Sequence, residues 1–227
     1  MKRQGGFTLI ELMIVIGIIA IIAAIAIPNL LAARVTSNER AAIATLRTIS
    51  SAQAQFQASA KADIDLDGSG EFGCFMELSG AWNVRNNPSL GSMNPPVLSA
   101  SFRTITPGGT GQVSRSGYFF TLLLPQWDGT SVTCDDNPAN LANVDAGLAE
   151  TTWCCYANPV TYGTSGRYTY VVNQTGDIIA TDSPTYAGLG LPCGSGAAFK
   201  TSNASSITGI LAVGTSGQDG RIWRQVQ

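Results

Sequence analysis

The long apolar stretch of this chain begins with Gly6-Phe7-Thr8-Leu9-Ile10-Glu11, and residues 12–33 after it carry no charged side chain. A helix over residues 12–33 is roughly 33 Å long, enough to cross a bilayer core of about 30 Å. Lys2 and Arg3 precede the stretch with no acid beside them, so the N-terminus is expected in the cytoplasm. The sequence therefore predicts one membrane-spanning helix.

Glu11 is out of place in such a helix. A carboxylate within a membrane segment costs about 2.5–3.5 kcal/mol even on insertion scales. The nearest downstream cation, Arg34, is 23 residues away, or roughly 35 Å along a helix. We therefore expect the partner of Glu11 to come from another chain. A secretory signal peptide would have a shorter apolar core, and an ordinary anchor explains neither Glu11 nor the Gly6–Phe7 junction.

The segment Gly6-Phe7-Thr8-Leu9-Ile10-Glu11, with Pro28 downstream, resembles the class III signal of type IV prepilins and type II secretion pseudopilins. The resemblance covers about residues 5–34. It implies that a membrane prepilin peptidase cuts between Gly6 and Phe7, removing the leader 1–6, and that Phe7 is then N-methylated. It also implies that Glu11 pairs with the Phe7 ammonium of a neighbouring subunit in a filament.

Pro28 lacks a backbone N–H and clashes with the carbonyl one turn back, so we expect the helix to be kinked or locally open near it. The resemblance implies that this opening accompanies the transfer of the subunit from membrane to filament. A static kink in a membrane helix is the alternative.

An amphipathic pattern continues the helix over residues 34–60. Its apolar residues recur at helical spacing on one face: Val35, Ala42, Leu46, Ile49 and Phe56. The rest of the surface carries Arg34, Glu39, Arg40, Arg47, Gln53 and Gln57. We expect a rod of roughly 80 Å, made of a membrane or filament-core part at 7–33 and a part at 34–60 packed on a head at 61–227.

The head has the composition of strands and turns. All 5 Cys, 4 Trp and 6 Tyr lie after residue 60. Strands are predicted at 118–124, 152–159, 167–173, 177–181 and 221–226, with a hairpin turn at 174–176. The stretches 85–115 and 183–220, rich in Gly, Ser, Asn and Pro, are predicted to be long surface loops. The fold class is α+β, and resembles the pilin fold: a long N-terminal helix, kinked near Pro28, on a C-terminal antiparallel sheet.

An acidic segment follows the predicted helix. Asp63, Asp65, Asp67, Gly68 and Glu71 match the first nine places of an EF-hand calcium loop, and Ser69 offers a backbone carbonyl. The twelfth place holds Cys74 instead of a bidentate glutamate, and no exiting helix is predicted. Two interpretations stay open: a site for calcium or another divalent ion, and a solvated turn. Calcium is the one candidate cofactor, and none is required.

The five cysteines are Cys74, Cys134, Cys154, Cys155 and Cys193. Disulfides are expected in an exported head, and the odd number leaves one thiol over unless chains cross-link. Buried free thiols are the alternative. Cys154 and Cys155 are adjacent, so in a strand their side chains point to opposite faces. A bridge from Cys193 would resemble the disulfide-bounded loop of type IVa pilins, although the spacing differs.

Composition excludes several classes of function. The chain has no histidine, which removes Ser-His and Cys-His dyads and imidazole zinc sites. A net charge of -2 and a pI near 5.0 show no excess of positive charge of the kind that binds nucleic acid. We therefore expect no enzyme and no nucleic-acid partner.

The leading hypothesis, which rests on the resemblance, is a structural subunit of a type IV pilus-like filament. Its implied partners are other pilin subunits, a prepilin peptidase and an inner-membrane assembly machinery. The precursor would lie in the bacterial inner membrane, and the product in a periplasmic or extracellular filament. A type II secretion pseudopilin is one alternative, and a membrane-tethered adhesive protein is another.

Overall fold

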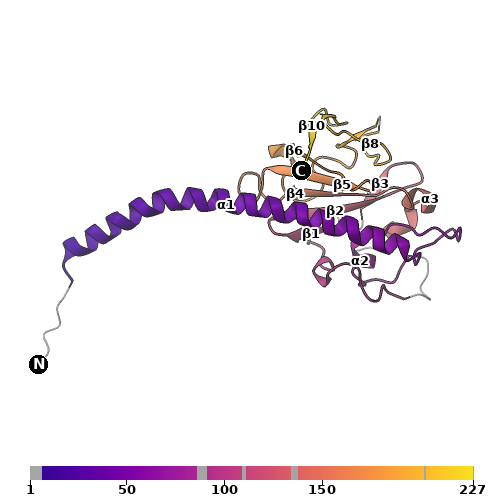
Figure 1. Ribbon diagram of the computed structural model, residues 1–227, viewed down its shortest axis with the longest axis horizontal. Helices are drawn as coiled ribbons and strands as arrows, with labels where there is room; N and C mark the ends of the chain where they lie inside the picture. Colours follow the sequence, from indigo (N-terminus) through magenta and orange to yellow (C-terminus); the bar gives the residue numbers. More distant parts are fainter. Residues whose placement is uncertain (1–6, 86–90, 109–110, 134–137, 202, 227) are drawn as a thin grey trace, which may run out of the picture.

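The structure is a computed structural model and describes residues 7–85, 91–108, 111–133, 138–201 and 203–226. Its dominant element is the helix α1 (Leu9–Ala58), whose 50 residues form a rod of about 75 Å. The first half of α1 projects away from the head, and the second half lies along it (Figure 1). The predicted long helix is confirmed, and it ends close to the predicted residue 60. The leader 1–6 lies outside the described residues.

The head is built on an antiparallel sheet. Among the described residues it has eight strands in the order β1-β2-β4-β5-β6-β10-β9, with β3 paired to β2. Their bounds are β1 (Gln112–Arg115), β2 (Tyr118–Pro125), β3 (Ser131–Thr133), β4 (Cys154–Pro159), β5 (Tyr168–Asn173), β6 (Ile178–Asp182), β9 (Thr215–Ser216) and β10 (Ile222–Gln225). The five predicted strands correspond to β2, β4, β5, β6 and β10. The predicted hairpin joins β5 to β6, with Tyr170 opposite Ala180.

Short elements complete the head. The α-helical turns are α2 (Phe75–Leu78) and α3 (Ala146–Ala149), and the 3-10 turns are η2 (Ala100–Phe102), η3 (Pro138–Asn143) and η4 (Pro184–Tyr186). A second, two-stranded sheet pairs β7 (Phe199–Lys200) with β8 (Ile210–Leu211).

The main sheet is covered on both faces, as the alternation along β4 shows. Cys155 and Ala157 pack in the core that α1 covers, whereas Cys154 and Tyr156 pack in a second core on the opposite face. From α1, the first core takes Ala42, Leu46, Ile49, Ala52 and Phe56. The second core is centred on Trp223, which lies fully buried in β10. Both faces of the central strands are therefore dry: β2 and β4 are buried throughout, and β5 and β6 are buried at all but one residue each.

The prediction of long surface loops at 183–220 is wrong in part. Tyr186, Phe199, Ile207 and Leu211 are buried in the second core, and β7 and β8 lie within this segment. The prediction for 85–115 is also wrong in part, because Met93, Leu98, Phe102 and Val113 are buried in the first core. In both stretches the apolar residues are spaced too irregularly to reveal a periodicity, yet several of them are buried in the two cores.

Candidate functional site

The first turn of α1 holds Glu11 within its own chain. The backbone N–H of Thr8 donates to Glu11 Oε2 at 2.9 Å, and the Thr8 hydroxyl donates to the same oxygen at 2.7 Å. Thr8 Oγ1 in turn accepts from the Glu11 N–H at 3.3 Å, which completes a capping box. These hydrogen bonds bring no opposite charge to Glu11, so the expectation of a charged partner from another chain stays a prediction. Within the described residues, no cation pairs with Glu11.

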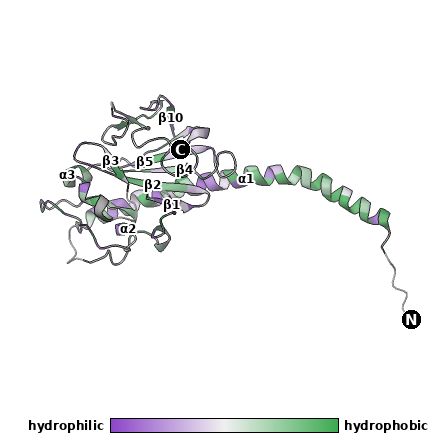
Figure 2. Ribbon diagram, turned by 180° about the vertical axis from the view of Figure 1, so that it is seen from behind, coloured by the Kyte–Doolittle hydropathy of each residue, from purple (hydrophilic) through white to green (hydrophobic). Residues whose placement is uncertain are grey.

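The first half of α1 is a bare apolar surface. Leu9 is 75% exposed, Ile21 67% and Leu30 70%, and the intervening large apolar side chains are also exposed. Figure 2 shows this half of the helix as almost continuously hydrophobic. Among the described residues, α1 is the one helix long and apolar enough to cross a membrane.

Pro28 lies inside α1, and the helix is continuous through it. The part of α1 that projects from the head curves (Figure 1). The helix is therefore bent, and it is not locally open at Pro28.

Polar contacts fix α1 where it meets the head. The Asn38 side-chain amide donates to the Ser165 carbonyl at 2.9 Å, and Glu39 Oε1 accepts from the Arg167 N–H at 3.0 Å. Both contacts join the helix to the loop between β4 and β5. The sequence placed Glu39 on the polar surface and gave no signal for its partner, because the two residues are 128 positions apart.

Gln53 is fully buried, although the helical periodicity predicts it on the polar side of α1. Its amide pairs with the backbone of Gly73 through two hydrogen bonds, of 2.7 and 3.0 Å. A side chain at position 73 would meet the Phe56 ring at 2.7 Å, so the close approach needs glycine.

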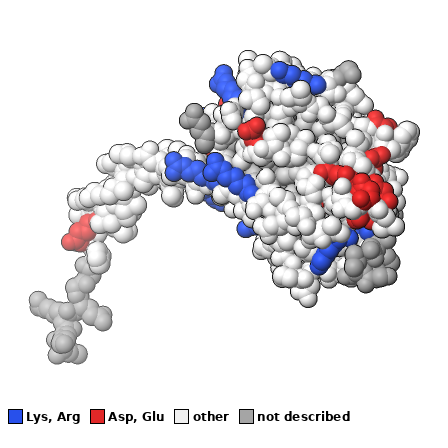
Figure 3. All heavy atoms as spheres, turned by 45° about the vertical axis from the view of Figure 1, so that its right-hand side comes forward, with Lys and Arg blue, Asp and Glu red and all other residues white. Residues whose placement is uncertain are grey.

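The acidic segment brings three of its predicted ligands together. Ligand oxygens of Asp63, Asp65 and Asp67 lie within 4.8 Å of one another. The Asp63 carboxylate accepts from the N–H groups of Asp67 and Gly68, each at 3.2 Å, and Asp67 accepts from the Ser69 N–H at 2.7 Å. These bonds curl the loop so that its carboxylates point to one place. Figure 3 shows acidic side chains gathered on the head, apart from the basic side chains along α1.

Glu71 lies outside this group. Its carboxylate is buried, with Oε2 at 3.3 Å from Arg85 Nη2 and Oε1 accepting from the Ile64 N–H at 2.9 Å. Arg85 also pairs with the buried Glu77 at 3.3 Å. Burial raises the pKa of Glu71, and the neighbouring Arg85 partly offsets this shift. Glu71 thus anchors the loop to the head.

Glu150 was not singled out from the sequence, yet its carboxyl group interacts electrostatically with the three aspartates. Desolvation raises the pKa of Glu150, and the charges of Asp67, Asp65 and Asp63 raise it further. Its Oε1 atom is buried and accepts no hydrogen bond in the described structure. Because Glu150 is distant from the loop in sequence, no local motif could have revealed it.

The described cysteines divide between the two cores. Cys74 and Cys155 lie in the core beneath α1, and Cys154 lies in the second core, against which Cys193 packs. All four are free thiols. Adjacent Cys154 and Cys155 point to opposite faces of the sheet, as predicted. Cys134 lies outside the described residues.

Comparison with known proteins connects these features to a family. A family model described as "Prokaryotic N-terminal methylation motif" matches residues 1–27. The chain is 53% identical over 57 residues to the "Type IV wide pilus major component PilA4" of Thermus thermophilus, covering 25% of this chain and 44% of that protein. It is 33% identical over 118 residues to the "Type IV major pilin protein PilA" of Myxococcus xanthus, covering 52% of each.

The chain thus spans about half the length of the curated relatives it matches. No solved structure matches it. The N-terminal motif, the two relatives and the architecture of a long apolar helix on an antiparallel sheet together support the assignment of this chain to the type IV pilin family.

Proposed function

We propose that this chain is a structural, non-enzymatic subunit of a type IV pilus-like filament, assembled through the first half of α1. The observation that carries the proposal is the bare apolar surface between Leu9 and Leu31. An apolar surface of this extent in water is unfavourable and marks an interaction site. Lipid covers it in the precursor, and the same surface on other copies covers it in the filament.

Both the proposed processing and the proposed assembly involve the first turn of α1. The proposed peptidase cut between Gly6 and Phe7 creates an ammonium group close to Glu11. Pairing of Glu11 with the Phe7 ammonium of a neighbouring copy neutralises two charges in an apolar environment, and a subunit out of register leaves one of them unpaired. Before assembly, the hydrogen bonds from Thr8 satisfy the carboxylate.

The proposed location follows from the same helix. Lys2 and Arg3 hold the N-terminus of the precursor in the cytoplasm, and the head lies beyond the inner membrane. An assembly machinery in that membrane then moves the subunit into a periplasmic or extracellular filament.

The test replaces Glu11 by alanine in the full chain, with Met13→Leu as the matched control in the same exposed half of α1. We expect Glu11→Ala to be cleaved like the wild type but to be absent from the filaments sheared off the cells. We expect Met13→Leu to be cleaved and to be present in the sheared filaments, like the wild type. A normal yield of filaments from Glu11→Ala would overturn the pairing.

We also propose that the loop of Asp63, Asp65 and Asp67 binds calcium or a similar hard divalent cation. Carboxylate oxygens are the ligands that calcium prefers, and Ser69 adds its backbone carbonyl. Glu150 Oε1 is buried without a hydrogen bond, and burial and the charges of these aspartates raise the pKa of Glu150, which favours a cation over a solvated turn. Glu71, predicted as a ligand, would instead support the loop through Arg85.

Thermal melting of the full chain in detergent, with and without millimolar calcium, tests the cation site. We expect calcium to raise the melting temperature of the wild type and of Asp177→Asn, an exposed aspartate in the β5–β6 turn. The same addition should leave Asp65→Asn unchanged. If calcium shifts none of the three proteins, the loop is a solvated turn.

A further inference from the structure

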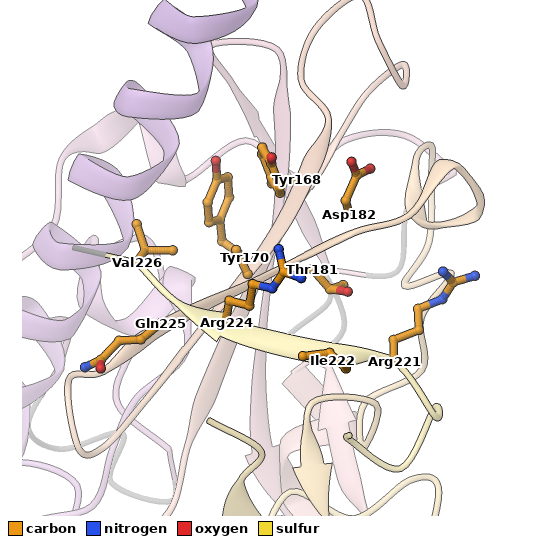
Figure 4. A pocket seen from close by; sticks show the side chains of 10 residues that line it. Tyr168, Tyr170, Thr181, Asp182, Arg221, Ile222, Arg224, Gln225 and Val226 are labelled. Atoms are coloured by element: carbon orange, nitrogen blue, oxygen red, sulfur yellow. The ribbon is translucent and has the colours of Figure 1, made fainter. Parts of the chain in front are cut away.

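A pocket of about 600 Å³ opens at the edge of the main sheet, where β10 separates from β6 (Figure 4). The two strands pair only through Arg224 with Ala180 and Gln225 with Ile179. Beyond that point Ile222 and Trp223 pair with β9 instead. Thr181 and Asp182 therefore have partners in β5 but none in β10, and the gap between the strands becomes the pocket.

One wall of the pocket is aromatic. Tyr168 and Tyr170 come from β5, with ring centroids 6.3 Å apart and planes at 48°. Tyr170 is buried in the floor, whereas Tyr168 is 41% exposed and offers its ring to a ligand. Packing in the core thus fixes the inner tyrosine, and the outer one is left as a docking surface.

The facing wall supplies positive charge. Arg224 extends from β10 across the opening toward the side chains of β5 and β6 (Figure 4). Within the described residues the guanidinium of Arg224 makes no ion pair or hydrogen bond. Arg221, at the rim, stacks over the Tyr186 ring at 5.1 Å and is held in place by it. Arg224 is therefore the cation available to a ligand.

Asp182 supplies the hydrogen-bond acceptor. The Tyr162 hydroxyl donates to its Oδ1 at 2.8 Å, which fixes the carboxylate. Oδ2 accepts no hydrogen bond within the described part of the chain. An ionised carboxylate has several acceptor positions, so Asp182 can take hydroxyl donors from a bound molecule.

We propose that this pocket binds a carboxylate-bearing sugar unit of an acidic saccharide. A guanidinium matches a carboxylate through two parallel hydrogen bonds, which suits Arg224 to the acid group. The sugar hydroxyls donate to Asp182 Oδ2, and the apolar face of the sugar ring packs on Tyr168. The volume falls in the range of small-molecule sites. An apolar ligand would leave Arg224 and Asp182 desolvated without partners, which is costly.

This inference does not depend on filament assembly, because all its residues belong to the head of one copy. Arg224 and Tyr168 are exposed side chains, so replacing them leaves both cores intact. The measurement is isothermal titration of the full chain in detergent with trigalacturonate, and with maltotriose as the neutral saccharide of equal length.

We expect trigalacturonate to bind the wild type at least 10-fold more tightly than maltotriose. Arg224→Gln and Tyr168→Ala should each weaken trigalacturonate binding about 10-fold or more, with unchanged melting temperatures. Arg34→Gln, which removes an exposed arginine of α1 away from the pocket, should bind like the wild type. Absence of binding at millimolar trigalacturonate, equal binding by Arg224→Gln, or equal binding of maltotriose would each overturn the proposal.

Discussion

The side-chain amide of Gln53 forms a pair of hydrogen bonds with the backbone of Gly73. Gln53 Nε2 donates to the Gly73 carbonyl at 2.7 Å, and Gln53 Oε1 accepts from the Gly73 N–H at 3.0 Å. The amide takes the place of a neighbouring strand for this residue. It ties the second half of α1 to the segment that leads from the acidic loop into α2.

Replacing Gln53 by alanine should lower the free energy of unfolding by about 2–4 kcal/mol, because both backbone groups of Gly73 stay buried without partners. Gln55→Ala is the matched control, since Gln55 is exposed on the same helix, and it should change stability by less than about 0.5 kcal/mol. Denaturant unfolding of the full chain in detergent measures both. Equal effects of the two substitutions would contradict the role of the pair.

Glu71 should make stability depend on pH. Because burial raises its pKa above the unfolded value of 4.5, the folded state holds this proton more tightly than the unfolded state does. The contribution of Glu71 to stability is therefore greatest below pH 4.5 and falls as pH rises through the folded pKa.

The measurement for Glu71 is the melting temperature of Glu71→Gln minus that of the wild type, across pH 4 to 8. This difference should become more positive as pH rises, because glutamine cannot ionise. Asp177→Asn, an exposed acid in a turn, serves as the control. If the difference in melting temperature between Glu71→Gln and the wild type stays constant from pH 4 to 8, the pKa of Glu71 is not raised in the folded state.

Thr8 should act in assembly by holding Glu11. Thr8→Val removes the hydroxyl that donates to Glu11 and caps α1, and loss of such a cap costs about 1 kcal/mol. We expect a reduced yield of sheared filaments, less severe than the loss in Glu11→Ala, because the backbone N–H of residue 8 remains. Thr8→Ser should restore the yield. Equal yields from Thr8→Val and Thr8→Ser would show that the hydroxyl has no part in assembly.

Oxidation of the head should join Cys154 to Cys193. Both pack in the second core, where burial raises the pKa of Cys154, and the charges of Cys155 and Cys193 raise it further. Two thiols would lose two electrons and two protons to added oxidised glutathione. Peptide mapping without reductant should find this pair linked, and Cys193→Ser should leave Cys154 free. A link from Cys193 to Cys134 would contradict the expectation.

The sequence predicted those parts of the fold that depend on local patterns. The apolar run before Arg34, the helical spacing of Leu46, Ile49 and Phe56, and the hairpin between β5 and β6 are all local signals. These signals were sufficient to predict a long helix packed on an antiparallel sheet. The packing of residues 183–220 could not be predicted, because their apolar side chains have no regular spacing. Phe199 and Ile207 are buried only because the sheet lies beneath them.

In the candidate sites, too, local patterns predicted some residues correctly, and partners distant in sequence decided the others. The spacing of Asp63, Asp65 and Asp67 brought their carboxylates together as predicted. Glu71 belongs to the same motif, but Arg85 holds it elsewhere, and Glu150, from a distant segment, interacts electrostatically with the aspartates of the loop. The periodicity of α1 likewise assigned Gln53 to the polar side. In each case the deciding partner is far away in sequence, so no local pattern could reveal it.

Electron microscopy of the sheared surface fraction, combined with mass spectrometry of the N-terminus of its roughly 23-kDa band, is the most direct test of assembly into a filament. We expect filaments whose subunit begins at N-methylated Phe7. A chain that still begins at Met1 and stays in the membrane fraction, with no filaments in the sheared material, would contradict this expectation.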